Sequence, residues 1–201
     1  RHILHSLVRM TSGYILAVGI GLLSAVLLGL SKYLRYAFKP LLSFFISIPT
    51  ITWVPFLLIF TGISETTILI TIFLGSYFAI VYNTLDGFDN IDPNWVRAGK
   101  MFEYSRATIL FRIFIPGSMN NIIVGLKLGI AYSWRALVGA EMLGAAQYGL
   151  GYQVFAARKF YNLPALITAL LLIGIIGYLL NRILVMTLEK NTIIKWGFHG
   201  H

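Results

Sequence analysis

The sequence predicts an all-α integral membrane protein whose 201 residues form one transmembrane domain, 1–201. Only 11% of the residues are charged and 58% are hydrophobic, whereas an ordinary soluble domain carries about 25% charged residues. The mean hydropathy is +0.80, and uncharged runs reach the ~20 residues that a helix needs to cross a bilayer. The charge deficit excludes an ordinary soluble domain, and no repeat or low-complexity linker divides the chain.

Five spanning helices are expected in this chain. The first and third are the uncharged runs 11–30 and 66–85. The second covers 40–61, where Pro49 and Pro55 interrupt the run. Because proline lacks a backbone N–H, we expect a short lead-in helix at 40–48 followed by a broken span.

The two remaining spans lie in the second half of the chain. The run 118–143 is apolar but carries Lys127, Arg135 and Glu141, and 160–181 is an uninterrupted apolar run. Charged residues inside a span are costly and usually face the protein interior or water. The three charges therefore mark 118–143 as the span to search for function.

The basic residues predict the orientation, because they are enriched in cytoplasmic loops. Nine of them fall on one side of the predicted spans: Lys32, Arg35, Lys39, Arg97, Lys100, Arg106, Arg112, Lys190 and Lys195. Four fall on the other side: Arg1, Arg9, Arg158 and Lys159. The loop 86–116 is therefore expected in the cytoplasm and residue 1 outside. A protein that starts in the cytoplasm would need one more helix before residue 1, for about six in total.

Residue types exclude several classes of site. The chain has no cysteine, so disulfides and thiolate metal sites are impossible. All four histidines lie near the ends, at His2, His5, His199 and His201, and no catalytic or metal site is expected. The net charge of +9 is compatible with nucleic acid, but basic residues set between apolar spans favour lipid headgroups.

The loop at about 89–116 begins with a helix-start signal. Asp92 is a candidate N-cap and Pro93 fits the first helical turn. We expect an amphipathic helix over 95–110, and we expect Pro116 to break the chain before the next span. One interpretation is a helix that lies on anionic headgroups.

The span 118–143 allows two interpretations of its charges. Arg135, with Lys127, Tyr132 and Ser133, would line a pathway that favours an anionic solute. Alternatively, Lys127 snorkels toward the headgroups, while Arg135 pairs with a buried carbonyl or with Glu141. Arg135 and Glu141 are six residues apart and so do not share a helical face, which weakens that pairing.

Other positions are expected to be structural. Glu141 is interpreted as a tie to the glycine-rich turn that contains Gly149 and Gly151. Four glycines are expected at close helix contacts: Gly19, Gly21, Gly125 and Gly129. The segment 147–160 is expected to form an outer re-entrant or amphipathic segment, which would either contact a docked protein or lie on the headgroups.

The stretch 97–117, RAGKMFEYSRATILFRIFIPG, is similar to a loop of bacterial ABC importer permeases. That loop reads E-A-A, three residues, G, nine residues, I, one residue, L-P. Aligned on Pro116, its isoleucine falls on Ile113 and its second and third positions on Ala98 and Gly99. Arg97 and Glu103 replace its opening glutamate and its glycine.

Two further blocks resemble the subfamily of binding-protein-dependent ABC importer permeases that serves nitrate, sulfonate, taurine, bicarbonate and thiamine-precursor uptake. They are AEMLGA at 140–145 with GLG at 149–151, and SIPTITWVP at 47–55 followed by Gly62 and Ile63. The resemblance runs from Leu4 to about Trp196. It implies a type I ABC importer permease fold.

The resemblance also implies partners. Two permeases, identical or paralogous, pair across a pathway, and each inserts its loop into a cytoplasmic ATPase subunit that binds ATP and Mg. A periplasmic or lipid-anchored protein delivers the solute outside, and no cofactor is expected in this chain. The implied coupling residues are Arg97, Ala98, Gly99, Lys100, Glu103, Ser105, Ile113 and Pro116. Arg97 suggests an acidic ATPase groove, and Glu103 suggests that the bend moves to Gly99 or disappears.

The resulting expectation is an importer permease in the bacterial inner membrane that moves a small polar, anionic solute inward. The chain has no G-x-x-x-x-G-K-[ST] pattern, so ATP hydrolysis is expected on a separate subunit. An ion-gradient-driven transporter or channel is the alternative, although Asp86 and Glu141 lie at span ends and not in mid-span. A membrane enzyme is a third and weaker possibility, because no convergent acid, base or metal cluster is visible in the sequence.

Overall fold

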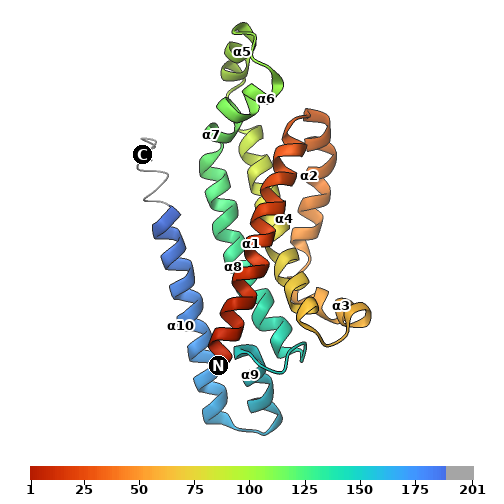
Figure 1. Cartoon of the computed structure of the whole chain (residues 1–201), viewed down its shortest axis with the longest axis vertical. Helices are drawn as coiled ribbons and strands as arrows, with labels where there is room; N and C mark the ends of the chain where they lie inside the picture. The colour runs from red at the N-terminus through yellow and green to blue at the C-terminus, as the bar shows by residue number, and fades with distance from the viewer. Residues whose placement is uncertain (189–201) are drawn as a thin grey trace.

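The computed structural model describes residues 1–188, and every regular element in this part of the chain is helical. Four helices are long and apolar enough to cross a membrane: α1 (His2–Gly29), α4 (Glu65–Asp89), α8 (Met119–Met142) and α10 (Leu163–Leu188), the last counted over Leu163–Ile183. They run along the long axis of the molecule (Figure 1). With the bent pair described next, they match the five predicted spans.

The second span is the bent pair. Its first limb is α2 (Lys32–Ser47), and its second limb is η1 (Thr50–Thr52) with α3 (Trp53–Thr61), the limbs meeting at 82°. The break was expected, but α2 begins at Lys32 and not at residue 40. Its basic residues are tolerated within the helix because Arg35 and Lys39 pair with carboxylates on α4.

The α1–α4 contact repeats every eight residues. Gly13, Gly21 and Gly29 of α1 face Ile72, Ile80 and Phe88 of α4, in that order. A Cβ atom at Gly13 would lie 2.8 Å from Ile72 Cγ2, and one at Gly29 would lie 2.6 Å from Phe88 Cε2. Larger side chains would push the helices apart, so small residues set this parallel pairing.

Three of the four glycines expected at close contacts are confirmed there. Gly21, Gly125 and Gly129 all approach Ile80. Gly19 was wrongly placed among them, because nothing lies within 4 Å of the Cβ position there. Gly21 faces α4, whereas Gly19, two residues earlier, points about 200° away around the same helix.

The two ends of the bundle differ in the elements that they carry. One end carries α5 (Pro93–Met101), α6 (Arg106–Ile109), η2 (Leu110–Phe114) and α7 (Ile115–Gly117), while α9 (Leu150–Lys159) lies at the other end (Figure 1). The start of α2 lies at the α5 end and residue 1 at the α9 end, which agrees with the predicted grouping of basic residues. Lys190, Lys195, His199 and His201 lie outside the described residues.

The outer segment α9 packs against the rest of the protein through one face. Leu150, Val154 and Ala157 are buried on α9, and a Cβ at Gly151 would lie 2.4 Å from the Val138 carbonyl oxygen of α8. One face of α9 therefore packs against α8, and the expectation that the segment lies on headgroups stays a prediction.

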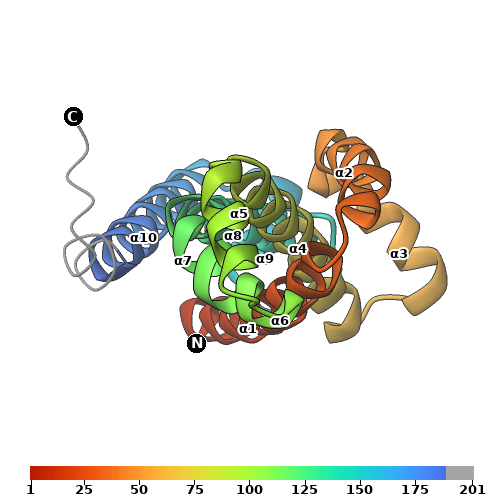
Figure 2. The same cartoon turned by 90° about the horizontal axis from the view of Figure 1, so that it is seen from above.

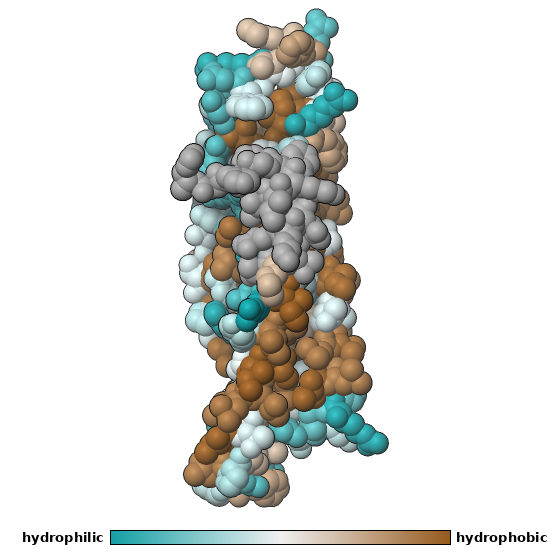
Figure 3. Space-filling view, turned by 90° about the vertical axis from the view of Figure 1, so that its left-hand side faces the viewer, coloured by the Kyte–Doolittle hydropathy of each residue, from teal (hydrophilic) through white to brown (hydrophobic). Residues whose placement is uncertain are grey.

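Much of the apolar surface is turned outward. Viewed from above, α10 flanks the bundle on one side and α2 and α3 flank it on the other (Figure 2). The described part of α10 presents a continuous apolar strip (Figure 3), which includes Leu163, Ile167, Leu170, Leu171, Ile175, Leu179 and Ile183. Such a surface suits lipid or other helices and would be costly in water.

Candidate functional site

A pocket of 380 Å³ lies at the bend between α2 and α3, where α4 and α8 close it. Its aromatic lining comes from several elements and includes Phe45 of α2, Trp53 of α3, Phe78 of α4 and Tyr132 of α8. Arg135 of α8 also lines it and supplies a positive charge. The bend at Pro49 thus produces a concave site between the two limbs of the second span.

Arg135 has an exposed side chain that contacts an aromatic ring and no carboxylate. Its guanidinium carbon lies 5.9 Å from the centroid of the Tyr132 ring. Among the described residues, no carboxylate lies within ion-pair distance of it. It lies sixteen residues beyond Met119, roughly 24 Å along α8. A positive charge at this depth is therefore open to an external anion.

The structure separates the four residues that the sequence grouped around this pathway. Tyr132 and Arg135 line the pocket, whereas Ser133 is completely buried and bonds to Ser76 and to the Gly129 carbonyl (2.9 Å). Lys127 is half-buried and is not part of the pocket lining. Since successive residues turn by 100° around a helix, Ser133 points to α4, and its assignment to the pathway lining is corrected.

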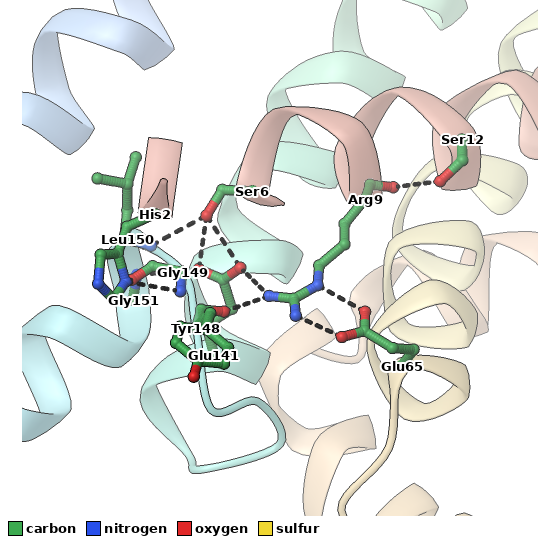
Figure 4. Close-up of polar contacts among 10 residues, drawn as sticks. All are labelled: His2, Ser6, Arg9, Ser12, Glu65, Glu141, Tyr148, Gly149, Leu150 and Gly151. Carbon is green, nitrogen blue, oxygen red and sulfur yellow. Dashed lines mark hydrogen bonds and ion pairs between the residues drawn. The ribbon is translucent and has the colours of Figure 1, made fainter. Parts of the chain in front are cut away.

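A second polar cluster joins α1, α4 and α8 at the α9 end of the bundle (Figure 4). Arg9 donates to Glu141 at 2.9 Å and to Glu65 at 2.6 Å, and it also donates to the Tyr148 carbonyl. Ser6 donates to both carboxylate oxygens of Glu141 at 2.9 Å. The alternative that paired Glu141 with Arg135 is wrong, because Arg9 occupies that position.

Glu141 also holds the glycine-rich turn after α8. Its carboxylate accepts a hydrogen bond of 3.0 Å from the Gly151 N–H. A Cβ at Gly149, whose φ is +148°, would lie 2.2 Å from this carboxylate, and one at Gly151 would lie 2.7 Å from Glu141 Cβ. Only glycine fits at these two positions, which places Gly149 and Gly151 in a structural role beside Glu141.

Three residues of this cluster were not predicted from the sequence: Arg9, Ser6 and Glu65. The predicted first span began at residue 11 and therefore excluded Ser6 and Arg9. In the structure α1 begins at His2 and buries both residues. A polar residue every three or four positions in a helical stretch is the signal that would have placed them on one face.

The loop after α4 forms a helix–turn–helix. Asp92 caps α5 as predicted, accepting a hydrogen bond of 2.8 Å from the Asn94 N–H. The helix then ends at Met101, so the single helix expected over 95–110 is wrong. Ser105 caps α6 through a hydrogen bond of 3.1 Å from the Thr108 N–H.

The turn between α5 and α6 is made at Glu103, in the left-handed conformation with φ +55°. Glu103 N–H donates to the Lys100 carbonyl at 3.0 Å and Tyr104 N–H donates to the Gly99 carbonyl at 3.0 Å. This pair of bonds is a Schellman motif, in which the left-handed position usually holds glycine. The expectation that the bend would move to Gly99 or disappear is therefore wrong, because the backbone bonds favour the turn even with a Cβ present.

Gly99 serves close packing and not bending. A Cβ there would lie 2.7 Å from Ile113 Cδ1 and 3.4 Å from Ile109 Cγ1, so α5 lies directly against the helix that follows. Pro116 does not break the chain, since helical structure continues from Arg106 to Gly117. Just before Pro116 the helix widens into a π-helix over η2. This wider turn accommodates a proline, which has no backbone N–H to donate.

The outer side of this loop is basic and apolar. Arg97, Ala98 and Lys100 are exposed on α5. Met101 and Phe102 at its end are 85% and 73% exposed. Large exposed apolar side chains beside cations, at the tip of a rigid turn, are typical of a surface that binds another protein.

An ionic cluster lies just below this loop. Lys39 of α2 contacts Asp86 at 2.8 Å and Asp89 at 2.9 Å, and Arg35 Nε lies 3.2 Å from Asp89. Asp86 also accepts a hydrogen bond of 3.4 Å from Asn121 of α8. The cluster ties α2 and α8 to the last turn of α4, three residues before the cap of α5.

Comparisons with known proteins agree with this architecture. Residues 17–190 match the family of binding-protein-dependent transport system inner membrane components. A probable ABC transporter permease protein of Brucella melitensis is 34% identical over 179 residues, which are 89% of this chain and 72% of the relative. The taurine transport system permease protein of Escherichia coli is 29% identical and covers 90% of this chain and 65% of the relative.

Another relative and a solved structure extend the comparison. The nitrate import permease protein of Synechocystis is 30% identical and covers 88% of this chain and 64% of the relative. A chain of the inward-facing MetNI methionine ABC transporter superposes with a TM-score of 0.79 at 18% identity, covering 94% of each chain. At that identity the likeness shows the fold alone, which is that of a type I ABC importer permease. This chain belongs to the family of binding-protein-dependent transport system inner membrane components and is a membrane-spanning permease subunit.

Proposed function

We propose that this permease serves an ATP-driven importer in a bacterial cytoplasmic membrane and moves a small anionic solute inward. The negative charge proposed for the solute is supported by the solutes for which its relatives are named: taurine, aliphatic sulfonates, nitrate and bicarbonate. All of these carry an anionic group.

The observation that carries the proposal is Arg135 in the pocket of the second span. Arg9, Arg35 and Lys39 each contact a carboxylate, whereas Arg135 lies over the Tyr132 ring and has no carboxylate partner within residues 1–188. A charge at membrane depth is costly unless it is paired or reaches a water-filled cavity. An anion that enters the pocket supplies the missing partner, and the guanidinium offers it a planar, two-pronged donor.

The proposed coupling surface is the loop at about 89–116. Its exposed part presents Arg97, Ala98 and Lys100 with the apolar side chains of Met101 and Phe102. Gly99, Glu103, Ser105, Ile113 and Pro116 would hold its shape. Arg97 and Lys100 favour an acidic groove on the ATPase subunit, which binds ATP and Mg.

The assembly would have two permeases, identical or paralogous, and a periplasmic or lipid-anchored binding protein at the α9 end. Each ATPase would move α5 as a rigid lever, because Gly99 packs it against the helix that follows. Motion at α5 would reach the pocket through α4 and α2, since the ionic cluster around Lys39 joins these helices.

Two measurements test the proposal. Purification of the permease from native membranes in mild detergent, followed by mass spectrometry, should recover an ATPase subunit. In vesicles containing the complete transporter, Arg135→Gln should reduce ATP-dependent uptake of the delivered anion about 10-fold to 100-fold, since a charged hydrogen bond contributes about 1.5–3 kcal/mol. Arg182→Gln, on the exposed side of α10, is the control.

An ion-gradient-driven transporter is the alternative, and the same vesicles distinguish it. Recovery of the permease alone, together with ion-dependent uptake in vesicles that lack ATP, would overturn the ATP-driven assignment.

A further inference from the structure

The pocket that contains Arg135 has an aromatic wall on its α2–α3–α4 side. Phe45 contacts two other rings of this wall: its centroid is 4.9 Å from that of Phe78, at an interplanar angle of 11°, and 6.1 Å from that of Trp53. All three side chains are half-buried and line the pocket. Since they come from three different helices, their contacts with one another hold the wall in place.

The volume of the pocket exceeds what a small inorganic anion needs. At about 30 Å³ per water, 380 Å³ corresponds to on the order of a dozen waters. A nitrate or bicarbonate ion pairing with Arg135 would leave most of the space and the aromatic wall hydrated. Sites of 300 Å³ or more with mainly apolar walls and a few polar groups are typical of small organic ligands.

The charge in the pocket is a single guanidinium. Arg135 is the charged residue in its lining, and the hydroxyl of Thr50 adds a neutral hydrogen-bonding group. One planar cation matches one carboxylate or sulfonate group. The aromatic wall matches a flat apolar group, which stacks with its face offset on the rings.

We infer that the pocket takes an organic monoanion that carries a flat apolar group, with the anionic group on Arg135 and the apolar group on Phe45, Trp53 and Phe78. This inference rests on the proposed function, because it assigns the class of solute to the same site. It makes the permease itself selective, in addition to the protein that delivers the solute. It also separates this chain from relatives named for nitrate and bicarbonate.

The test is direct binding to the intact transporter in lipid nanodiscs, measured by titration calorimetry without nucleotide. The probes are benzenesulfonate, methanesulfonate, nitrate and benzyl alcohol. Benzenesulfonate should bind at least about 10-fold more tightly than each of the other three, because it alone combines the charge with the ring.

Two variants separate the two parts of the inference. Phe45→Ala should reduce benzenesulfonate affinity to the level of methanesulfonate and leave methanesulfonate unchanged. Phe44→Ala is the matched control, since Phe44 is adjacent and 62% exposed but does not line the pocket. Arg135→Gln should abolish binding of both sulfonates. Phe45→Leu keeps an apolar side chain and replaces Phe45→Ala if that variant loses its monodisperse elution.

The outcomes distinguish this inference from the proposed function. Equal, Arg135-dependent binding of benzenesulfonate, methanesulfonate and nitrate, unaffected by Phe45→Ala, would overturn the organic class and keep the anion site. Binding that does not depend on Arg135, or no binding of any probe, would overturn both. Recovery of the ATPase subunit tests the ATP-driven assignment independently of each result.

Discussion

The guanidinium of Arg9 lies 2.9 Å from the carboxylate of Glu141 and joins the first turns of α1 to the last turn of α8. Glu141 has no exposed surface and Arg9 is 6% exposed. Ser6 and the Gly151 N–H complete the hydrogen bonds of the carboxylate. The pair therefore organises the end of the bundle that also carries α9.

Removing one member of this pair should be strongly destabilising. We expect Glu141→Gln to lower the free energy of unfolding by about 3 kcal/mol or more, because Arg9 would keep a buried charge with one carboxylate fewer. Thermal melting of the purified transporter measures the change. Glu65→Gln is the control with a smaller expected effect, since the Glu65 side chain is 62% exposed. Equal losses in both variants would contradict the central role of Glu141.

Glu103 occupies a backbone conformation that suits glycine. Its φ of +55° costs a residue with a Cβ roughly 1–2 kcal/mol. We expect Glu103→Gly to leave the melting temperature unchanged or to raise it. Ala98→Gly, within α5, should instead lower stability by about 1 kcal/mol, because glycine weakens a helix interior. A loss of stability in Glu103→Gly as large as that in Ala98→Gly would disprove the strained turn.

The α1–α4 contact allows a matched comparison of two glycines in one helix. Gly29→Val should destabilise the protein by several kcal/mol or prevent folding, because its Cβ would meet the Phe88 ring at 2.6 Å. Gly19→Val should be tolerated, because nothing lies within 4 Å of that position. Expression level and monodisperse elution in detergent distinguish the two variants. Similar behaviour of Gly29→Val and Gly19→Val would contradict the close contact between Gly29 and Phe88.

The cluster of Lys39, Asp86 and Asp89 should contribute moderately to stability. Lys39→Gln leaves two carboxylates near each other on the last turn of α4 without their shared cation. We expect a loss of about 1 kcal/mol that shrinks at high salt, because the group is partly exposed and therefore screened. Lys32→Gln is the control, since Lys32 lies over the Tyr36 ring and pairs with no carboxylate of the described residues. Melting curves at low and high salt measure this loss of stability. A loss of the same size at both salt concentrations would contradict an ionic origin.

The proposed coupling surface predicts a separation of transport from ATP hydrolysis. Arg97 is exposed and makes one long hydrogen bond of 3.4 Å to Asn94, and Lys100 is also exposed. Charge reversal by Arg97→Glu or Lys100→Glu should therefore leave membrane insertion intact while lowering solute transported per ATP hydrolysed. Vesicles that hold the complete transporter measure this ratio. Unchanged coupling in both variants would remove these residues from the contact.

Local patterns in the sequence were sufficient for part of this structure. The spans follow from apolar runs of about 20 residues, most of them uncharged, and the bend in the second span follows from Pro49. The cap at Asp92 was also predicted, because a cap depends only on neighbouring residues. The family followed from the spacing around Pro116 and from the AEMLGA block.

The site was predicted less completely. Tyr132 and Arg135 were selected by their chemistry inside a span, but Ser133 was included although it faces Ser76. The aromatic wall around Phe45 was not visible in the sequence, because its three rings come from three helices. The turn at Glu103 was missed, because backbone hydrogen bonds outweighed a local preference for glycine.

The sequence by itself determined that this chain crosses the membrane, where its spans lie and which family it resembles, because composition and spacing carry that information locally. Only the tertiary structure decided that Arg9 pairs with Glu141 across 132 positions, and that Arg135 meets aromatic residues of other helices in one pocket. Such contacts depend on how helices pack around one another. That packing is set by close approaches such as that of Gly29 to Phe88, which no single segment specifies.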